Sequence, residues 1–111
     1  MTIKELCEIA NTQLVIRYPS VEGRYHACIA DAEIKENPDD PILQACFGYG
    51  DTADSAIYEM IHSMRGKTLI MRAGYHLTFK VPETLTKGNL RNNTNNGALR
   101  LLSHGSWSYT T

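Results

Sequence analysis

Hydrophobic residues near the start of this chain recur at helical spacing. Residues 2–5 have the Thr-x-x-Glu pattern of a capping box, in which the hydroxyl of Thr2 and the carboxylate of Glu5 bond each other's backbone amides. The apolar stripe behind it consists of Ile3, Leu6, Cys7 and Ala10. Asn11 is suited to end a helix, because asparagine tolerates the left-handed conformation found there. The pattern predicts a short first helix.

Three extended segments follow, over residues 13–18, 24–35 and 42–49, and turn-forming residues separate them. In the second segment one face carries Tyr25, Ala27 and Ile29 and the other carries His26, Cys28 and Ala30. In the third segment the alternating apolar residues are Leu43, Ala45 and Phe47. Consecutive strands joined by short connections predict an antiparallel meander.

The helical spacing returns after Thr52, which can cap a helix that runs to about residue 64. Its apolar face consists of Ala53, Ala56, Ile57, Met60, Ile61 and Met64. Asp51 and Asp54 lie near its positive end, Arg65 and Lys67 near its negative end, and Gly66 can stop it. This pattern predicts an amphipathic helix packed on the sheet.

Two more strands are predicted over residues 67–71 and 75–81, and Pro82 ends the second. The predicted fold class is therefore α+β, with an antiparallel sheet of about five strands in the order αβββαββ. Residues 1–83 are expected to form the domain. Residues 84–111 are rich in asparagine and glycine and are expected to form a flexible tail, since their composition buries little apolar surface.

The formal net charge is only −1, but it is unevenly distributed. Residues 1–83 hold all 12 acidic side chains and eight of the 11 lysines and arginines, a net charge of −4. Residues 84–111 hold the remaining three basic residues and no acid, a net charge of +3. The body is therefore acidic and the tail weakly basic, and three charges are too few for a nucleic-acid tail because affinity scales with the phosphates neutralised.

The chain shows no basic stretch followed by an apolar run at its start and no long apolar segment, so we expect a cytoplasmic protein with no membrane contact. The odd number of widely spaced cysteines favours reduced, buried thiols. They are Cys7, Cys28 and Cys46. No Cys-x-x-Cys or His-x-x-x-His pair accompanies them, so neither a metal site nor a cofactor is expected.

No arrangement of residues indicates catalysis. Four histidines are scattered over separate elements, and the acidic pairs 39–40 and 51/54 lie in a turn and at a helix start, where acids have structural reasons to occur. The stretch Gly48-Tyr49-Gly50-Asp51-Thr52 leads a strand into a helix but lacks the complete pattern of a nucleotide-binding loop. A tight turn that needs small residues is the expected explanation, and we do not expect an enzyme.

The order of elements over residues 2–65 resembles the double-stranded-RNA-binding domain. Gly48-x-Gly50-x-Thr52, followed by Ala56, looks like that family's glycine-rich entry into its second helix. In that family lysines at this helix start hold phosphates, whereas Asp54 lies at the matching place here. The resemblance implies a shared fold, and nucleic-acid binding is not expected from it.

Residues 50–57, Gly-Asp-Thr-Ala-Asp-Ser-Ala-Ile, are also similar to the helix start in the core of HicB antitoxins, and that likeness extends from Leu14 to Met71. It implies an antitoxin whose acidic body masks a small basic toxin. The first helix, this core and the strand that runs into Val81-Pro82 also look like small accessory proteins of phages and prophages. That resemblance implies an anti-defence protein in the bacterial cytoplasm.

We therefore expect a non-enzymatic, phage-type binding protein that blocks or sequesters a host factor. The alternatives are a HicB-like antitoxin that binds a cognate toxin and a nucleic-acid-binding module. The candidate partner-binding residues are Asp51, Asp54, Tyr58, Glu59, His62, Lys80, Arg91, Arg100, Trp107 and Tyr109. In the strand 75–81 Lys80 is the only residue that discourages pairing at the sheet edge, and the tail carries apolar residues. We therefore expect a homodimer that forms through this edge and the tail.

Overall fold

The computed structural model describes residues 1–18, 23–72, 78–88, 100–102 and 106–108. Its elements are α1 (Ile3–Ala10), β1 (Leu14–Arg17), β2 (Tyr25–Lys35), β3 (Gln44–Gly50), α2 (Ala53–Met64), β4 (Thr68–Met71), β5 (Thr78–Lys80), β6 (Arg100–Leu102) and β7 (Ser106–Ser108). From α1 to β5 the order is helix, three strands, helix, two strands, and every strand pair is antiparallel. The predicted α+β fold class is confirmed. Residues 75–77 of the last predicted strand lie outside the described residues.

Both helices begin and end as their sequences predict. Thr2 and Glu5 form the capping box of α1, and Asn11 ends the helix in the left-handed conformation with φ 51°. Thr52 caps α2 by accepting from the amide of Ser55, whose hydroxyl accepts in return from the amide of Thr52. Gly66, with φ 74°, follows the C-cap of α2. All the predicted apolar positions of both helices are buried.

β2 is the central strand of the sheet and has three partners. Its first half pairs with β1 and its second half with β4, whereas β3 pairs with both halves. Cys28 is opposite both Val15 and Phe47, so β1 and β3 lie on opposite edges of β2. The meander of the first three strands is therefore confirmed, and β4 returns to the edge of β2 that β1 occupies.

The alternation of core-facing and outward-facing residues in β2 reverses at Asp31, which has a positive φ of 58°. The carbonyl oxygen of Asp31 accepts a hydrogen bond from the amide of Arg72, at 2.9 Å, where β4 meets β2. The buried residues of β2 are Ala27, Ile29, Ala32 and Ile34. Core-facing positions are thus odd before Asp31 and even after it, because the irregularity between Cys28 and Glu33 gives β2 three more residues than β3 and so reverses the alternation.

In β3 the larger apolar side chains face solvent, whereas in an ordinary half-buried strand they face the core. The apolar residues that alternate in the sequence are all on the solvent side, and they are Leu43, Ala45 and Phe47. The core side carries Cys46 and two glycines, since α2 lies directly against the backbone of this strand. A Cβ atom on Gly48 would lie 2.9 Å from Cα of Met60, and one on Gly50 would lie 2.8 Å from the carbonyl carbon of Ser55. Close helix packing therefore excludes larger side chains from the core side of β3.

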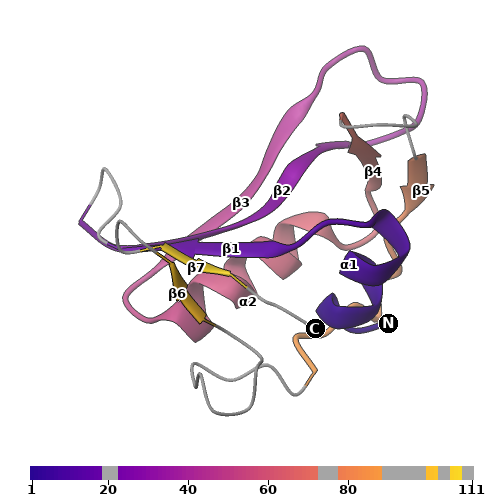
Figure 1. The fold of residues 1–111 in the computed structure, drawn as a ribbon. Helices are drawn as coiled ribbons and strands as arrows, with labels where there is room; N and C mark the ends of the chain where they lie inside the picture. Colours follow the sequence, from indigo (N-terminus) through magenta and orange to yellow (C-terminus); the bar gives the residue numbers. More distant parts are fainter. Residues whose placement is uncertain (19–22, 73–77, 89–99, 103–105, 109–111) are drawn as a thin grey trace.

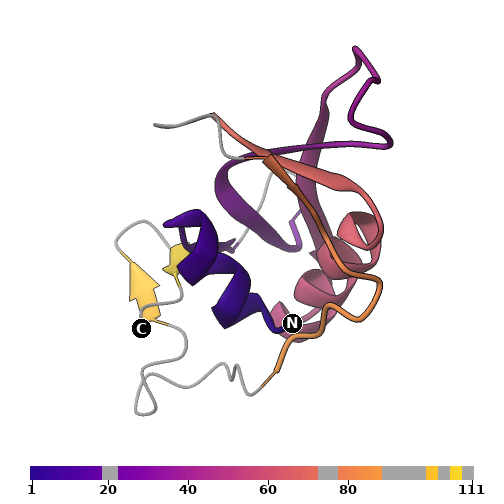
Figure 2. The same ribbon diagram turned by 90° about the vertical axis from the view of Figure 1, so that its right-hand side faces the viewer.

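Both helices lie on the same side of the curved sheet (Figures 1 and 2), and their buried stripes join the inward residues of the strands in one core. The fold therefore has two layers. Neither of the two described helices lies on the outward side of β1, β2 and β3, and we call the part of this side around β1 the open face of the sheet.

The folded body continues past residue 83, where the sequence places its end. After β5 the chain runs between the start of α1 and the end of α2 (Figure 2), and Leu85 is fully buried. The guanidinium of Arg65 donates two hydrogen bonds to the carbonyl oxygen of Leu85, at 2.8 and 3.0 Å. Thr86 exchanges backbone hydrogen bonds with Met1 and Ile3, each 3.0 Å long. These contacts assign residues 84–88 to the domain.

Two short strands from the C-terminal segment extend the sheet beyond β1. β7 pairs with β1, with Trp107 opposite Ile16, and β6 pairs with β7. The described part of this segment is therefore placed against the domain itself. Among the described residues, neither helix has the length and apolar character that crossing a membrane requires.

Candidate functional site

The predicted site residues on and just before α2 are exposed to solvent. They are Asp51, Asp54, Tyr58, Glu59 and His62. Lys87 joins two of them, because its Nζ lies 2.7 Å from Oδ1 of Asp54 and 5.9 Å from the centre of the Tyr58 ring. The sequence gives no sign of this contact, which links residues far apart in the chain. It offsets the charge of Asp54, so this helix face is less acidic than its sequence indicates.

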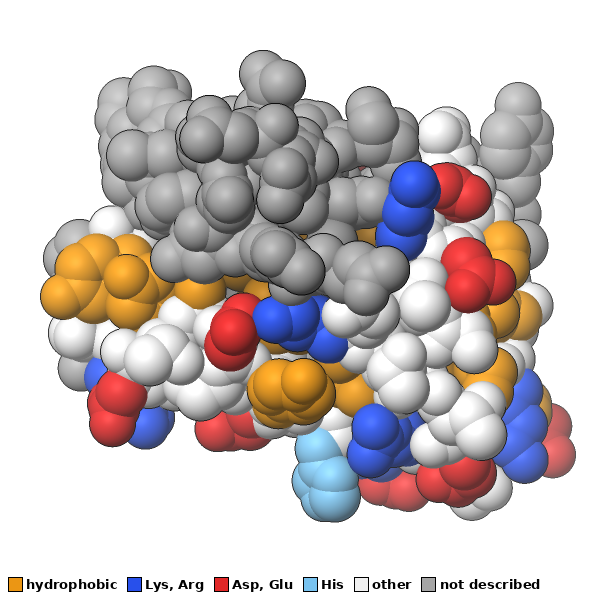
Figure 3. All heavy atoms as spheres, turned by 90° about the horizontal axis from the view of Figure 1, so that it is seen from below, with side chains coloured by type: hydrophobic (Ala, Val, Ile, Leu, Met, Phe, Trp, Pro, Cys, Tyr) orange, Lys and Arg blue, Asp and Glu red, His pale blue; other side chains and the backbone are white. Residues whose placement is uncertain are grey.

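Figure 3 shows the molecule from below the view of Figure 1. Basic and acidic side chains are interspersed on this side, and hydrophobic side chains appear in separate small groups. Tyr58 is the exposed aromatic residue of α2, with 56% of its surface accessible. A mixed surface of this kind is typical of a solvated face and lacks the continuous apolar patch that marks many interaction sites.

The other predicted site residues do not join this cluster. Lys80 is exposed on β5, whereas Arg100 and Trp107 lie on β6 and β7 at the opposite end of the strand order. Arg91 and Tyr109 lie outside the described residues. The predicted residues that the structure describes therefore do not come together into one site.

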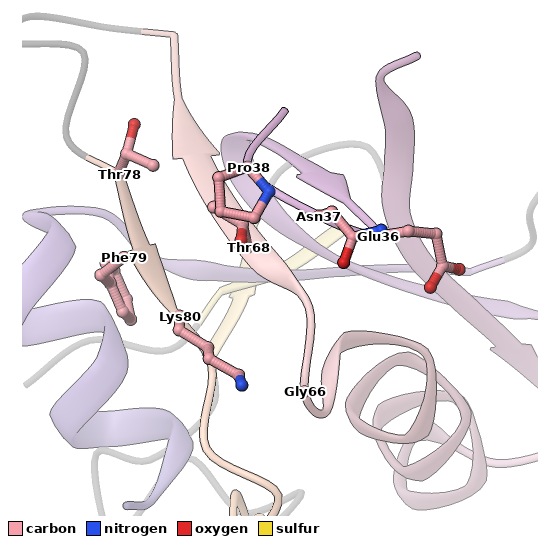
Figure 4. Close-up of a pocket in the computed structure, with 8 residues that line it drawn as sticks. All are labelled: Glu36, Asn37, Pro38, Gly66, Thr68, Thr78, Phe79 and Lys80. Atoms are coloured by element: carbon pink, nitrogen blue, oxygen red, sulfur yellow. The ribbon is translucent and has the colours of Figure 1, made fainter. Parts of the chain in front are cut away.

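Lys80 lines a cavity of about 410 Å³ between the turn that follows β2 and the strands β4 and β5 (Figure 4). The lining residues are Glu36, Asn37, Pro38, Gly66, Thr68, Thr78, Phe79 and Lys80. The carboxylate of Glu36 is 3.3 Å from Nζ of Lys67, so this acid already has a charged partner. Within the described residues no three potential metal ligands cluster, either here or elsewhere. The cavity offers two hydroxyls, an amide, one aromatic ring and the charged groups of Glu36 and Lys80.

The open face has a different chemistry. We define it as the outward side of β1, of β2 as far as Cys28 and of β3 from Phe47 onward, together with the residue that leads into β2. Its residues are Val15, Arg17, Arg24, His26, Cys28, Phe47 and Tyr49. None of these seven side chains is acidic, and three of them are aromatic rings. Phe47 is the most exposed of the three rings, with 38% of its surface accessible.

The three rings form a contiguous row across β2 and β3. The centre of the His26 ring lies 5.6 Å from that of Phe47 and 5.0 Å from that of Tyr49. Phe47 and Tyr49 meet edge to face at 5.4 Å. The guanidinium of Arg24 lies over the Tyr49 ring at 5.5 Å. Cross-strand register fixes this geometry, because His26 is opposite both Arg17 and Tyr49.

The electrostatic environment of the open face favours the neutral forms of His26 and Cys28. Burial lowers the pKa of His26 from its ordinary value of 6.5, and the positive charge of Arg17 lowers it further. Burial raises the pKa of the Cys28 thiol, and Arg17 opposes that shift. Cys28 therefore stays a thiol beside a neutral imidazole. This pair lacks the thiolate that nucleophilic catalysis needs.

His26 is expected to titrate below 6.5 in the folded chain. The unfolded chain takes up the proton first as the pH falls, so the contribution of this residue to the free energy of unfolding is complete above about pH 6.5 and declines below it. A titration of the His26 ring by NMR, from about pH 8 to pH 5, measures the shift directly. Replacing Arg17 with glutamine should raise the pKa toward 6.5. A midpoint above 6.5 in the parent chain would contradict the placement of this ring.

Sequence reasoning missed the open face. Phe47 and Tyr49 alternate in β3 as core residues would, and His26 alone gives no signal. The available signal is the two glycines that alternate with these rings: Gly48 and Gly50 occupy the positions that point toward the helix. A strand with glycines on one side and aromatic residues on the other indicates close packing on the glycine side, which leaves the aromatic side outward.

Comparison of the chain with protein-family models, with curated proteins and with solved structures found no match. The resemblances to the double-stranded-RNA-binding domain and to HicB antitoxins therefore remain interpretations of the sequence.

Proposed function

We propose that this chain is a non-enzymatic binding protein that recognises a host or cognate protein through the open face of its sheet. A phage-type accessory or anti-defence protein, acting in the bacterial cytoplasm by blocking or sequestering its target, is the form of this function that the sequence favours. The observation that carries the proposal is the solvent-facing row of His26, Phe47 and Tyr49, with Arg17 and Arg24 beside it.

The residue types of this row support recognition of a protein. Tyrosine, other aromatic residues and arginine are enriched at the centres of protein interfaces, where they supply apolar area together with polar or charged groups. The row is held in place by the strand register and by ring contacts, so little side-chain entropy is lost when it is covered. A rigid aromatic surface with two cations suits a partner that offers apolar and acidic groups.

The cysteine chemistry supports a function without covalent catalysis. Cys7 and Cys46 are buried, and burial raises the pKa of each thiol to about 12. Both are therefore protonated at neutral pH and packed in the core. They serve as small hydrophobic residues.

The two alternatives make different demands on the surface. A HicB-like antitoxin would use its acidic groups, and Asp54 is already paired with Lys87. A nucleic-acid-binding module would use the open face, since bases stack on aromatic rings and phosphates pair with Arg17 and Arg24. The open face as defined holds no acidic residue, and Glu33, on the outward side further along β2, is paired with Arg72. This favours the second alternative over the first.

Phe47→Ala is expected to weaken partner binding about 30-fold, because removing a central aromatic anchor costs about 2 kcal/mol. The matched control is Tyr58→Ala, which removes an exposed ring from α2 on the helical side and should leave binding unchanged. Immobilised parent and variants are incubated with bacterial lysate, and retained proteins are identified by mass spectrometry. The supporting result is a protein that the parent and Tyr58→Ala retain and that Phe47→Ala loses.

Two results would contradict the proposal. Loss of the retained protein by Tyr58→Ala alone would place the site on α2, as the sequence predicts. Retention of nucleic acid that is sensitive to nuclease and lost by Phe47→Ala would assign the open face to a nucleic-acid partner.

A further inference from the structure

β3 forms a free edge of the sheet. It pairs with β2 along one side, and among the described residues no strand pairs along its other side. α2 packs against the core face of β3 and therefore does not occupy the edge. In an antiparallel strand the backbone groups point alternately to the two sides, so half of those in β3 are directed away from β2.

This edge lacks the features that protect sheet edges. β3 runs for seven residues, Gln44–Gly50, without a charge or a proline. The other outer strands, β5 and β6, have three residues each and contain Lys80 and Arg100. Short length and charge are the usual means by which proteins prevent pairing at an edge. β3 has neither of them.

Exposed apolar side chains accompany the unprotected edge. Ile42 and Leu43, just before β3, have 65% and 48% of their surfaces accessible, and Phe47 on β3 has 38%. Water contact with these side chains is unfavourable, and covering them would add to the gain from strand pairing. The edge thus combines open backbone groups with an apolar border.

We propose that β3 pairs antiparallel with β3 of a second copy of this chain, which joins the two sheets across a two-fold axis. β3 can pair with a second copy of itself, because an uncharged strand places no like charges opposite each other in such a pair. A register centred on Phe47 uses all seven residues, with Phe47 opposite Phe47 of the partner subunit and Ala45 opposite Tyr49 of the partner subunit. Aromatic pairs of this kind are favourable across antiparallel strands.

The pairing has a consequence for the open face. Strands of one continuous sheet share their faces, so the aromatic rows of the two copies become neighbours on a single surface. This inference concerns self-association and does not depend on what the open face binds.

The interface is small, and the expected Kd of the dimer is roughly 10–100 μM.

Ala45→Lys is the direct test, because Ala45 is exposed on β3 and its side chain has no role in the core. Light scattering after size-exclusion chromatography, up to about 500 μM protein, should give a mass that rises toward the dimer for the parent and remains that of the monomer for Ala45→Lys. Tyr58→Lys places the same charge on α2 and should dimerise like the parent. Thermal melting checks that both variants are folded.

A cross-link tests the register. In a Cys28→Ser background, Ala45→Cys together with Tyr49→Cys should form a covalent dimer on oxidation, whereas either substitution alone should not. Within one chain these two positions are about 13 Å apart, too far for a disulfide. A parent chain that stays monomeric at about 500 μM, or an Ala45→Lys variant that dimerises like the parent, would overturn the proposal. A dimeric double-cysteine variant that forms no cross-link would overturn the register.

Discussion

Ile57→Asp is expected to leave the chain unfolded at room temperature. Ile57 has no solvent-accessible surface and lies in the middle of α2, where it faces the sheet. An ionised carboxylate at this position would be buried without a partner, and that costs at least several kcal/mol. The total stability of a domain of this size is about 5–15 kcal/mol, so one such charge is comparable to all of it. Circular dichroism and thermal melting measure the outcome.

Two variants control for other causes. Tyr58→Asp adds the same side chain at the next residue of the same helix, where 56% of the surface is accessible, so it should melt close to the parent. Ile57→Val removes one methylene and should cost only about 1 kcal/mol. A cooperative melt of Ile57→Asp within a few degrees of the parent would show that this face of α2 does not pack on the sheet.

Gly48→Ala is expected to lower the free energy of unfolding by about 3 kcal/mol, although it adds a single methyl group. The new Cβ atom would lie 2.9 Å from Cα of Met60 and closer still to the backbone nitrogen of Met60 and the carbonyl oxygen of Ala56. Backbone atoms cannot rotate away as a flexible side chain can, so α2 must move off β3 and loosen the core between them. The expected fall in Tm is roughly 15 °C.

Gly23→Ala separates this steric effect from the ordinary cost of replacing glycine. Gly23 has φ 74°, and a Cβ atom there would meet nothing within 4 Å. Its replacement should therefore cost only the conformational penalty, about 1 kcal/mol. Equal losses of stability for the two variants, measured by thermal or denaturant unfolding, would argue that α2 does not approach β3 as closely as the structure places it.

The helices could be predicted from sequence because local chemistry determines them. The Thr2 and Thr52 caps, the apolar stripes and the stop at Gly66 all act within a few residues, and they agree with one another. The antiparallel order of the first three strands also follows from their short connections. These features are sufficient to predict the α+β class and the packing of α2 on the sheet.

Which face of each strand is buried could not be predicted in the same way, because it depends on distances between elements. Phe47 points outward since α2 is too close to β3 for a side chain at Gly48, and that closeness involves residues on two elements. The reversal at Asp31 depends on where β1 ends and β4 begins along β2. Alternation in sequence gives two faces but does not say which one is buried.

The open face could not be predicted from the sequence for a related reason. Exposed polar residues on an amphipathic helix are visible in sequence, which is why Asp54 and Tyr58 were predicted. Their partner Lys87 comes from the segment after β5 and could not be foreseen. The open face needs three strands in register before His26 and Tyr49 become neighbours.

The contact between the first residues and Thr86 also affects the order in which the domain can assemble. α1 is fastened by backbone hydrogen bonds to a segment made after every other element of the core. During synthesis, at about 5–20 residues per second, the end of α2 emerges about one to four seconds before the residue that anchors α1, and β1, β2 and β3 emerge earlier still. The apolar face of α1 is therefore the last part of the core to be fixed in place during synthesis. Contacts so far apart in sequence slow folding, and until they form, this apolar face of α1 is a surface that a chaperone would meet.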